Sequence, residues 1–175
     1  MKRSLSIYLG LMLATVLFVS PGCSIHYGLS GSAVPEAMHT INVGFFENNA
    51  PIVVANLSQT FTEALKDRIR TTTRLNIVNG EADARMTGSI IGYSYAPVSV
   101  QATNPNAPPL ANASVLTITV KVKFVYDADK KLNFEQTFAK NVNFQGDIST
   151  QEQKLIKTVT TQLIDDIFNK AFNNW

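Results

Sequence analysis

Cys23 is the residue whose chemistry the sequence indicates most directly. It is the single cysteine of the chain, and it follows a run of small residues, 20–22, that is typical of a lipoprotein cleavage site. A basic amino-terminal end and an apolar run over residues 7–19 precede it, and this run is too short to cross a bilayer comfortably. We therefore expect residues 1–22 to be a lipoprotein signal peptide and Cys23 to carry a thioether-linked diacylglycerol. The alternative is an ordinary secretory signal, in which Cys23 would be an incidental thiol.

The segment after Cys23 predicts a lipid-anchored tether. Residues 23–38 are rich in Gly and Ser, which suppress regular structure. Ser24 stands where an Asp would retain a lipoprotein at the inner membrane, so the sequence favours the periplasmic side of the outer membrane. Several acyl chains, at ~0.8 kcal/mol per buried methylene, would make this anchoring essentially permanent.

Two lysines and two threonines on the polar side of a predicted strand are candidates for binding an anion. Lys121 and Lys123 alternate with apolar residues along one segment, as do Thr117 and Thr119, so all four should point to the same side of a strand. This side could contact the phosphates or sugars of an anionic ligand. The alternative is an ordinary solvated sheet face.

Three arginines near the end of a predicted helix are a second candidate set. The guanidinium groups of Arg68, Arg70 and Arg74 suit phosphate recognition. The alternative is that they are favourable charges at the carboxyl end of a helix.

The sequence indicates no catalytic or metal site. Asp127, Asp129 and Asp147 lack the glycine and terminal glutamate of a calcium loop. His26 and His39 have no second ligand at the spacing that zinc requires. We find no nucleophile with a base, no paired carboxylates and no phosphate cradle. Asp165 and Asp166 are adjacent on a helix and therefore diverge, and Asp166 with Lys170 has the spacing of a surface ion pair. We expect a protein that is not an enzyme and has no cofactor or metal.

The charge balance argues against nucleic-acid binding. The chain has 15 basic and 13 acidic residues, and removing residues 1–22 takes away Lys2 and Arg3, so 13 of each sign remain. A nucleic-acid binder would need a clustered basic surface. The remaining length suits one domain over residues 39–175, large enough to bury a core without a disulfide.

The amino-terminal half predicts a strand, a helix and a second strand. Ile41, Val43 and Phe45 alternate with polar residues over 40–46, which indicates a strand. A helical period begins at Leu57, with Thr60 and Glu63 at capping-box spacing, although Asn56 or Ser58 could equally be the cap. Residues 74–78 should form a short strand, and the order of these elements is that of a parallel βαβ crossover.

The carboxyl-terminal half predicts a meander and a long helix. Residues 86–94 should form a strand with Gly88 and Gly92 on one face, where a helix backbone could approach closely. The proline-rich stretch 96–113 predicts a long loop, either a contact segment or an ordinary excursion. Residues 115–126 alternate in the manner of a strand, residues 132–144 place five apolar side chains on one face, and the two segments should form a long antiparallel hairpin. Ser149 and Glu152 have capping-box spacing before an amphipathic helix that runs to the carboxyl terminus.

These elements predict an α+β fold: a two-layer sandwich with a mostly antiparallel sheet of about four to five strands and two helices packed on one face.

The residues also resemble a known family. The resemblance runs through nearly all of the chain after Cys23 and is carried by long segments, among them Leu57-Ser-Gln-Thr-Phe-Thr-Glu-Ala-Leu-Lys-Asp67, Leu116-Thr-Ile-Thr-Val-Lys-Val-Lys-Phe124, Asn133-Phe-Glu-Gln-Thr-Phe138 and Ile167-Phe-Asn-Lys-Ala-Phe-Asn-Asn-Trp175. Together they resemble the lipopolysaccharide-assembly lipoprotein family, LptE.

The resemblance implies an outer-membrane lipoprotein that plugs a large β-barrel translocon, LptD, and assists delivery of lipopolysaccharide to the cell surface. It transfers no lipid-binding residue to this chain, so the lysine and arginine candidates rest on the residues alone. The alternative function is a generic periplasm-facing lipoprotein adaptor, or a lipid-binding module, of another envelope machine.

Overall fold

The strand with the strictest alternation, β5 (Ala113–Tyr126), pairs along its length with β6 (Phe134–Gln145). The pairing is antiparallel, with Ala113 opposite Gln145 and Phe124 opposite Phe134. The even-numbered residues of β5 from Leu116 to Tyr126 are buried, whereas Lys121 and Lys123 are exposed. The predicted hairpin is therefore confirmed, and its two-residue period separates a buried face from a polar one.

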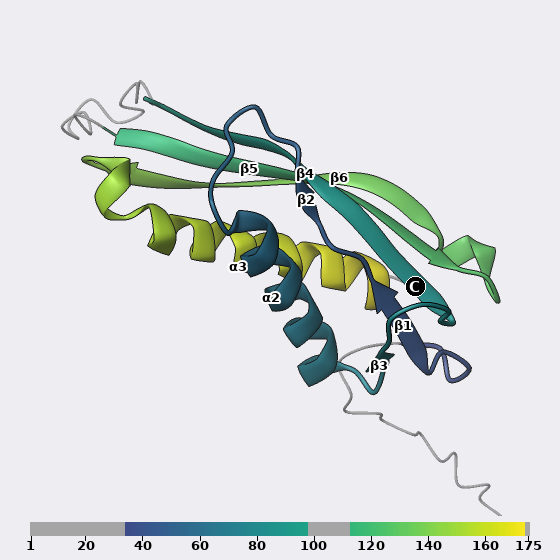
Figure 1. Cartoon of the computed structure of the whole chain (residues 1–175). Coiled ribbons are helices and arrows are strands. Elements are labelled where there is room, and N and C mark those ends of the chain that lie inside the picture. Colours follow the sequence, from purple (N-terminus) through teal and green to yellow (C-terminus); the bar gives the residue numbers. More distant parts are fainter. Residues whose placement is uncertain (1–33, 98–112, 174–175) are drawn as a thin grey trace, which may run out of the picture.

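The computed structural model describes residues 34–97 and 113–173, and Figure 1 shows their arrangement. The remaining elements are β1 (Thr40–Val43), β2 (Glu47–Asn48), α2 (Leu57–Thr72), β3 (Asn76–Ile77), β4 (Ala84–Pro97), the 3-10 turns η1 (Lys130–Leu132) and η2 (Ile148–Thr150), and α3 (Glu152–Phe172). The sheet has the order β3-β1-β4-β5-β6, and β2 also pairs with β4. The α+β prediction is confirmed, with six strands in place of four or five.

Short parallel pairings and long antiparallel pairings share this sheet. β1 lies parallel to β3, and α2 connects the two, so the predicted βαβ crossover is confirmed. β1 and β2 also run parallel to β4, but each contributes only a few residues. Most of the ladder is the antiparallel pairing of β4 with β5 and of β5 with β6.

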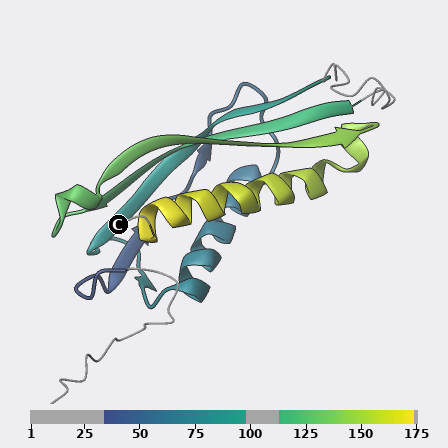
Figure 2. The same cartoon turned by 180° about the vertical axis from the view of Figure 1, so that it is seen from behind.

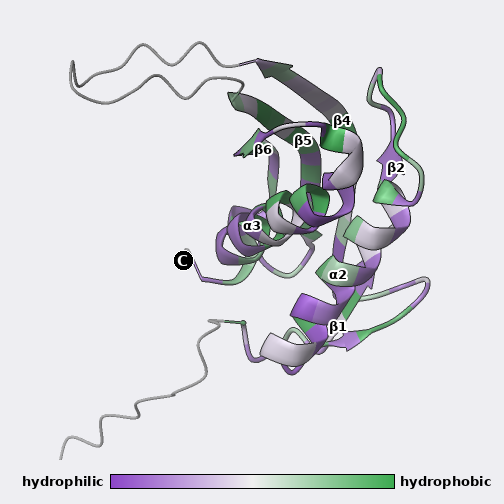
Figure 3. Cartoon of the chain, turned by 90° about the vertical axis from the view of Figure 1, so that its left-hand side faces the viewer, coloured by the Kyte–Doolittle hydropathy of each residue, from purple (hydrophilic) through white to green (hydrophobic). Residues whose placement is uncertain are grey.

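Both helices cover one face of the sheet, as Figure 2 shows from behind and Figure 3 shows on edge. The core between the layers is mostly aliphatic, and phenylalanine rings contact one another within it. The Phe124 ring of β5 lies 5.8 Å from that of Phe172 on α3 and 5.7 Å from that of Phe134 on β6. The opposite face of β4, β5 and β6 has no helix against it among the described residues, so it is open to solvent or to a partner.

The predicted strand over residues 40–46 is wrong at its end. β1 stops at Val43, and the chain breaks before β2 begins at Glu47. Phe45, expected on the buried side, is 59% exposed, whereas Phe46 is fully buried. The Phe46 N–H donates to the buried Thr62 hydroxyl at 3.0 Å, and the Phe46 ring lies 5.1 Å from that of Phe61. Packing against α2 therefore overrides the local alternation.

The expectation that Gly88 and Gly92 share a face is also wrong. A β-bulge lies between Ile90 and Gly92, so Gly88 pairs with the inward-facing Val122 and Gly92 with Thr119 on the outer side. An added Cβ at Gly88 would collide with the Lys121 carbonyl oxygen and come 2.5 Å from the Phe46 ring. The close neighbours are thus the backbone of β5 and an aromatic side chain, and not a helix backbone.

Neither predicted capping box forms. Helix α2 begins at Leu57, with Asn56 as its cap residue but without a side-chain capping bond. Ser149 lies within η2, and α3 begins at Glu152. The Glu152 carboxylate instead accepts a 2.7 Å hydrogen bond from the hydroxyl of the buried Tyr93 on β4. Burial, followed by this hydrogen bond, raises the pKa of Tyr93, so the phenol stays protonated and links the sheet to the start of α3.

We predict that Gly88→Ala destabilises the fold more than Gly44→Ala. The Gly88 substitution forces a methyl group against the backbone and the Phe46 ring, which should lower the free energy of unfolding by about 1–3 kcal/mol. At Gly44 the nearest atom to an added Cβ is the Thr87 side chain at 3.3 Å, so a smaller loss is expected. Urea denaturation of both variants measures the difference, and equal losses would contradict the packing assigned to Phe46.

Candidate functional site

The outer face of β4, β5 and β6 holds the lysines that the sequence singled out. Lys121 and Lys123 lie on β5 with their side chains 52% and 58% exposed. Thr117 and Thr119 point to the same side, as predicted, because the strand alternates without interruption. The structure therefore brings these four residues together on the face that neither helix covers (Figure 1).

Glu135 on β6 lies between the two lysines. Its carboxylate oxygens are 2.6 Å from the Lys121 Nζ and 4.0 Å from the Lys123 Nζ. The hydrogen bond and charge of Lys121, with a smaller contribution from Lys123, hold the pKa of Glu135 below its usual value. The pair of lysines therefore carries one uncompensated positive charge over this cross-strand cluster.

Arg85 is a cation of this face that the sequence reasoning missed. It lies on β4 opposite Val125 and is exposed on the same side as Lys123. The alternation of Arg85, Thr87 and Ser89 could have revealed it, but the strand was expected to begin at Met86, one residue after Arg85. We refer to Arg85, Lys121 and Lys123 as the outer cationic strip.

A polar hollow of about 340 Å³ lies beside this strip. The side chains that line it carry both signs of charge and one threonine hydroxyl. Hydrogen bonds from the backbone N–H groups of His39 and Thr40, and from the Thr40 hydroxyl, hold the pKa of Asp83 below its usual value. Cations suit phosphate oxygens, whereas carboxylates and hydroxyls suit sugar hydroxyls. The lining residues are Ala82, Asp83, Arg85, Thr87, Lys123, Val125 and Asp127.

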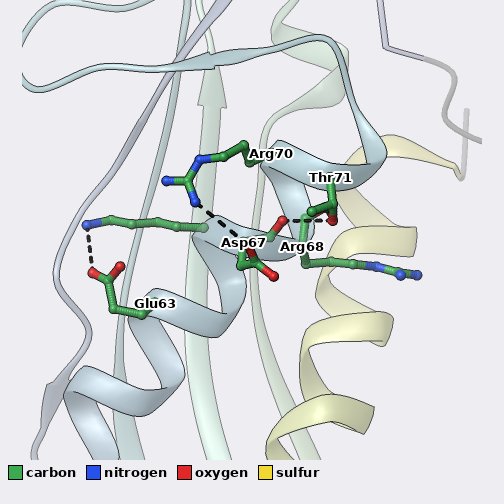
Figure 4. Close-up of polar contacts among 6 residues, drawn as sticks. Glu63, Asp67, Arg68, Arg70 and Thr71 are labelled. Atoms are coloured by element: carbon green, nitrogen blue, oxygen red, sulfur yellow. Dashed lines mark hydrogen bonds and ion pairs between the residues drawn. The ribbon is translucent and has the colours of Figure 1, made fainter.

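The candidate arginines lie away from the outer cationic strip. Arg68 extends from α2 toward α3 (Figure 4), where its guanidinium lies 3.1 Å from an Asp165 oxygen and 5.1 Å from the centroid of the Phe168 ring. Arg70 pairs with Asp67 of its own helix at 3.7 Å, and Arg74 is exposed just before β3. The structure does not unite the three arginines with the lysines, because α2 covers the opposite face of the sheet.

Asp165 and Asp166 diverge around α3 as expected and join it to two different elements. Asp165 pairs with Arg68 of α2, whereas Asp166 lies 2.9 Å from the Lys140 Nζ of β6. The expected pair of Asp166 with Lys170 is wrong, because the Lys170 Nζ lies over the Phe134 ring, 5.8 Å from its centroid. These ion pairs therefore link α3 to α2 and to β6.

The other candidate groups have structural roles or lie outside the described residues. Asp129 and Asp147 accept backbone N–H groups at the starts of η1 and η2. Within residues 34–97 and 113–173, no group of three His, Cys, Asp or Glu side chains could hold a metal. Cys23, His26 and most of the loop 96–113 lie outside the described residues.

No helix in the described part of the chain is long and apolar enough to cross a membrane.

Comparison with known proteins identifies the family. The model of the LptE family, described as lipopolysaccharide-assembly, matches residues 38–171. No curated protein matches the sequence.

Solved structures share the fold at low sequence identity. The hypothetical protein CT253 from Chlamydia trachomatis has a TM-score of 0.52 at 8% identity, over 79% of this chain and 100% of that chain. A putative neuraminyllactose-binding hemagglutinin homologue from Helicobacter pylori has a TM-score of 0.50 at 10% identity, over 83% and 89% of the two chains. The rare lipoprotein B from Shewanella oneidensis has a TM-score of 0.44 at 10% identity, over 75% and 90%.

The likeness to the first two of these structures shows the fold alone. The family match spans far more than half of the chain and agrees with the resemblance found in the sequence. This chain belongs to the LptE lipopolysaccharide-assembly family.

Proposed function

We propose that this chain is a non-enzymatic outer-membrane lipoprotein that assists the transport and assembly of lipopolysaccharide. The observation that carries this proposal is the family match over residues 38–171. Cys23 would anchor the protein in the outer membrane, with residues 39–175 on the periplasmic side or inside the lumen of a barrel. The proposal assigns it binding and positioning rather than catalysis.

The proposed partner is an LptD-type β-barrel, which the chain would plug. The exposed large apolar side chains of the described residues support a protein interface, because three of them flank β2 in the chain and two lie on β4. Ile52 and Val53 lie in the loop after β2, and part of this loop is green, that is hydrophobic, in Figure 3. Exposed apolar surface, where it is contiguous, typically marks an interaction site. The exposed side chains are Phe45, Ile52, Val53, Ile91 and Tyr95, which are 39% to 74% exposed.

The proposed contact for lipopolysaccharide is the outer cationic strip. Its lysines lie on the face away from the helical layer. Lys121 is paired with Glu135 at 2.6 Å, whereas Lys123 is 4.0 Å from the same carboxylate and is the lysine more open to an anionic phosphate. Arg68 is less suited because it is already engaged by Asp165 and Phe168. Arg70 and Arg74 remain exposed and would make a separate contact.

The first test is the recovery of partners from detergent-solubilised outer membranes with the tagged, acylated protein. We expect a large β-barrel of the lipopolysaccharide export system to copurify. Mass spectrometry identifies the partner. Recovery of other envelope machinery in its place would favour the alternative of a generic lipoprotein adaptor or lipid-binding module.

We predict that Lys121→Glu combined with Lys123→Glu reduces crosslinking to lipopolysaccharide by about tenfold, since two charge-assisted contacts become repulsive. The matched control is Lys130→Glu with Lys131→Glu, which makes the same charge change on η1, at the turn of the hairpin. Circular dichroism establishes that both variants fold. Equal crosslinking of the two variants would mean that Lys121 and Lys123 do not contact lipopolysaccharide and belong to an ordinary solvated sheet face.

We predict that Cys23→Ala abolishes acylation and moves the protein out of the membrane fraction. The reason is that the thioether bond to diacylglycerol needs the cysteine sulfur, and the methyl group of alanine cannot replace it. Metabolic labelling with a palmitate analogue and fractionation of the cells measure the two effects. Acylation that persists in this variant would refute the lipoprotein signal.

A further inference from the structure

A hollow of about 270 Å³ opens between the first turns of α2 and the amino-terminal half of α3. It lies in the helical layer, on the opposite side of the sheet from the outer cationic strip (Figure 1). Its walls combine polar side chains with small and branched apolar ones. The lining residues are Ala55, Asn56, Leu57, Thr60, Ala64, Gln153, Ile156, Lys157, Thr160 and Thr161.

The amino terminus of α2 meets this hollow through Asn56 and Leu57. The first N–H groups of a helix have no acceptor within it, and they give that end a partial positive charge. At α2 the cap residue Asn56 makes no side-chain capping bond, and the first turn contains no acidic residue. The positive end of this 16-residue helix is therefore not compensated by its own sequence.

Lys157 adds a full positive charge from the opposite wall. None of the described residues that line the hollow is acidic, so its formal charge is +1. The polar hollow on the outer face differs in this respect, because Asp83 and Asp127 lie there beside Arg85 and Lys123. Of the two, the hollow between the helices is the better electrostatic match for an anion.

Thr160 provides a separate indication of a ligand. Thr158 and Thr161, its neighbours on α3, each donate to the carbonyl oxygen four residues earlier, at 3.0 Å and 2.9 Å. Thr160 also lines the hollow but is only 2% exposed, and its Oγ1 has no partner among the described residues. A buried hydroxyl without a partner is costly, and an oxygen atom of a ligand at the floor of the hollow would satisfy it.

We propose that this hollow binds a phosphate group, either free or at the end of a lipid headgroup. The positive end of α2 and Lys157 attract the anion, and the hydroxyls of Thr60 and Thr160 bond its oxygens. Leu57, Ala64 and Ile156 offer apolar surface to the carbon atoms next to a lipid phosphate. The proposal is independent of the outer cationic strip and of any barrel partner.

The test uses the full mature chain, acylated and purified in a non-ionic detergent. Backbone amide shifts and thermal unfolding are followed with inorganic phosphate against chloride at equal ionic strength, and with dihexanoyl phosphatidic acid against dihexanoyl phosphatidylcholine. We expect phosphate or phosphatidic acid to shift the amides of residues 56–60 and 157–161 and to raise the melting temperature. Tighter binding of phosphatidic acid identifies a lipid headgroup, whereas equal binding identifies free phosphate. Binding of neither probe overturns the proposal.

Two variants and a control locate the site. Lys157→Gln should weaken binding of the anion by about tenfold, as expected for a lost charge-assisted hydrogen bond. Thr160→Val removes the unpartnered hydroxyl at constant shape, so the ligand-free protein should be as stable as the wild type or more stable, while its binding weakens severalfold. Lys154→Gln removes the same charge one turn earlier on α3, outside the hollow, and should leave affinity unchanged. Unchanged affinity in both Lys157→Gln and Thr160→Val would overturn the proposal.

Discussion

The two-residue period of β5 is the constraint on which the rest of the structure depends. Because β5 is paired on both sides, by β4 and β6, its inner side chains fix the face against which α3 must pack. The same period places Lys121 and Lys123 on the opposite face, where no helix competes for them. A shift of one residue in its register would bury both lysines and expose Val120 and Val122. One strand thus determines the core and the candidate site together.

Those parts of the fold that depend on long uninterrupted periods were predictable from the sequence. The β5–β6 hairpin, both helices and the βαβ order all follow from such periods. The errors occur where contacts between residues distant in sequence determine the local structure. Thr62 and Phe61 on α2 fix Phe46 and end the alternation of β1 early, and Tyr93 takes the Glu152 carboxylate that a capping box would have used. Local spacing contains neither contact.

The candidate site was predictable to a similar extent. Predicting that Lys121 and Lys123 lie on the outer face required only the alternation of one strand. Predicting the same for Arg85 required a correct start of the neighbouring strand, which begins at Ala84 and was expected to begin at Met86. The role of Arg68 was not accessible from local sequence, because its partner Asp165 lies on the other helix. Three of the charged side chains that looked suited to a ligand or to the surface, Arg68, Asp165 and Asp166, instead connect the helices to each other and, through Lys140, to β6.

This difference in the roles of the charged side chains explains how a nearly neutral chain can present a packed helical face and a separate cationic face. Ion pairs between exposed side chains contribute little to stability, but Arg68 and Lys140 orient α3 relative to α2 and β6 by satisfying Asp165 and Asp166. Among the described residues, Glu135 and the carboxylates of the polar hollow lie beside the cations left on the outer face. The proposed position beside a charged lipid and a barrel requires such separation, since one face must stay packed while another exchanges contacts. The open sheet face and the apolar residues around β2 meet that requirement without any change in the core.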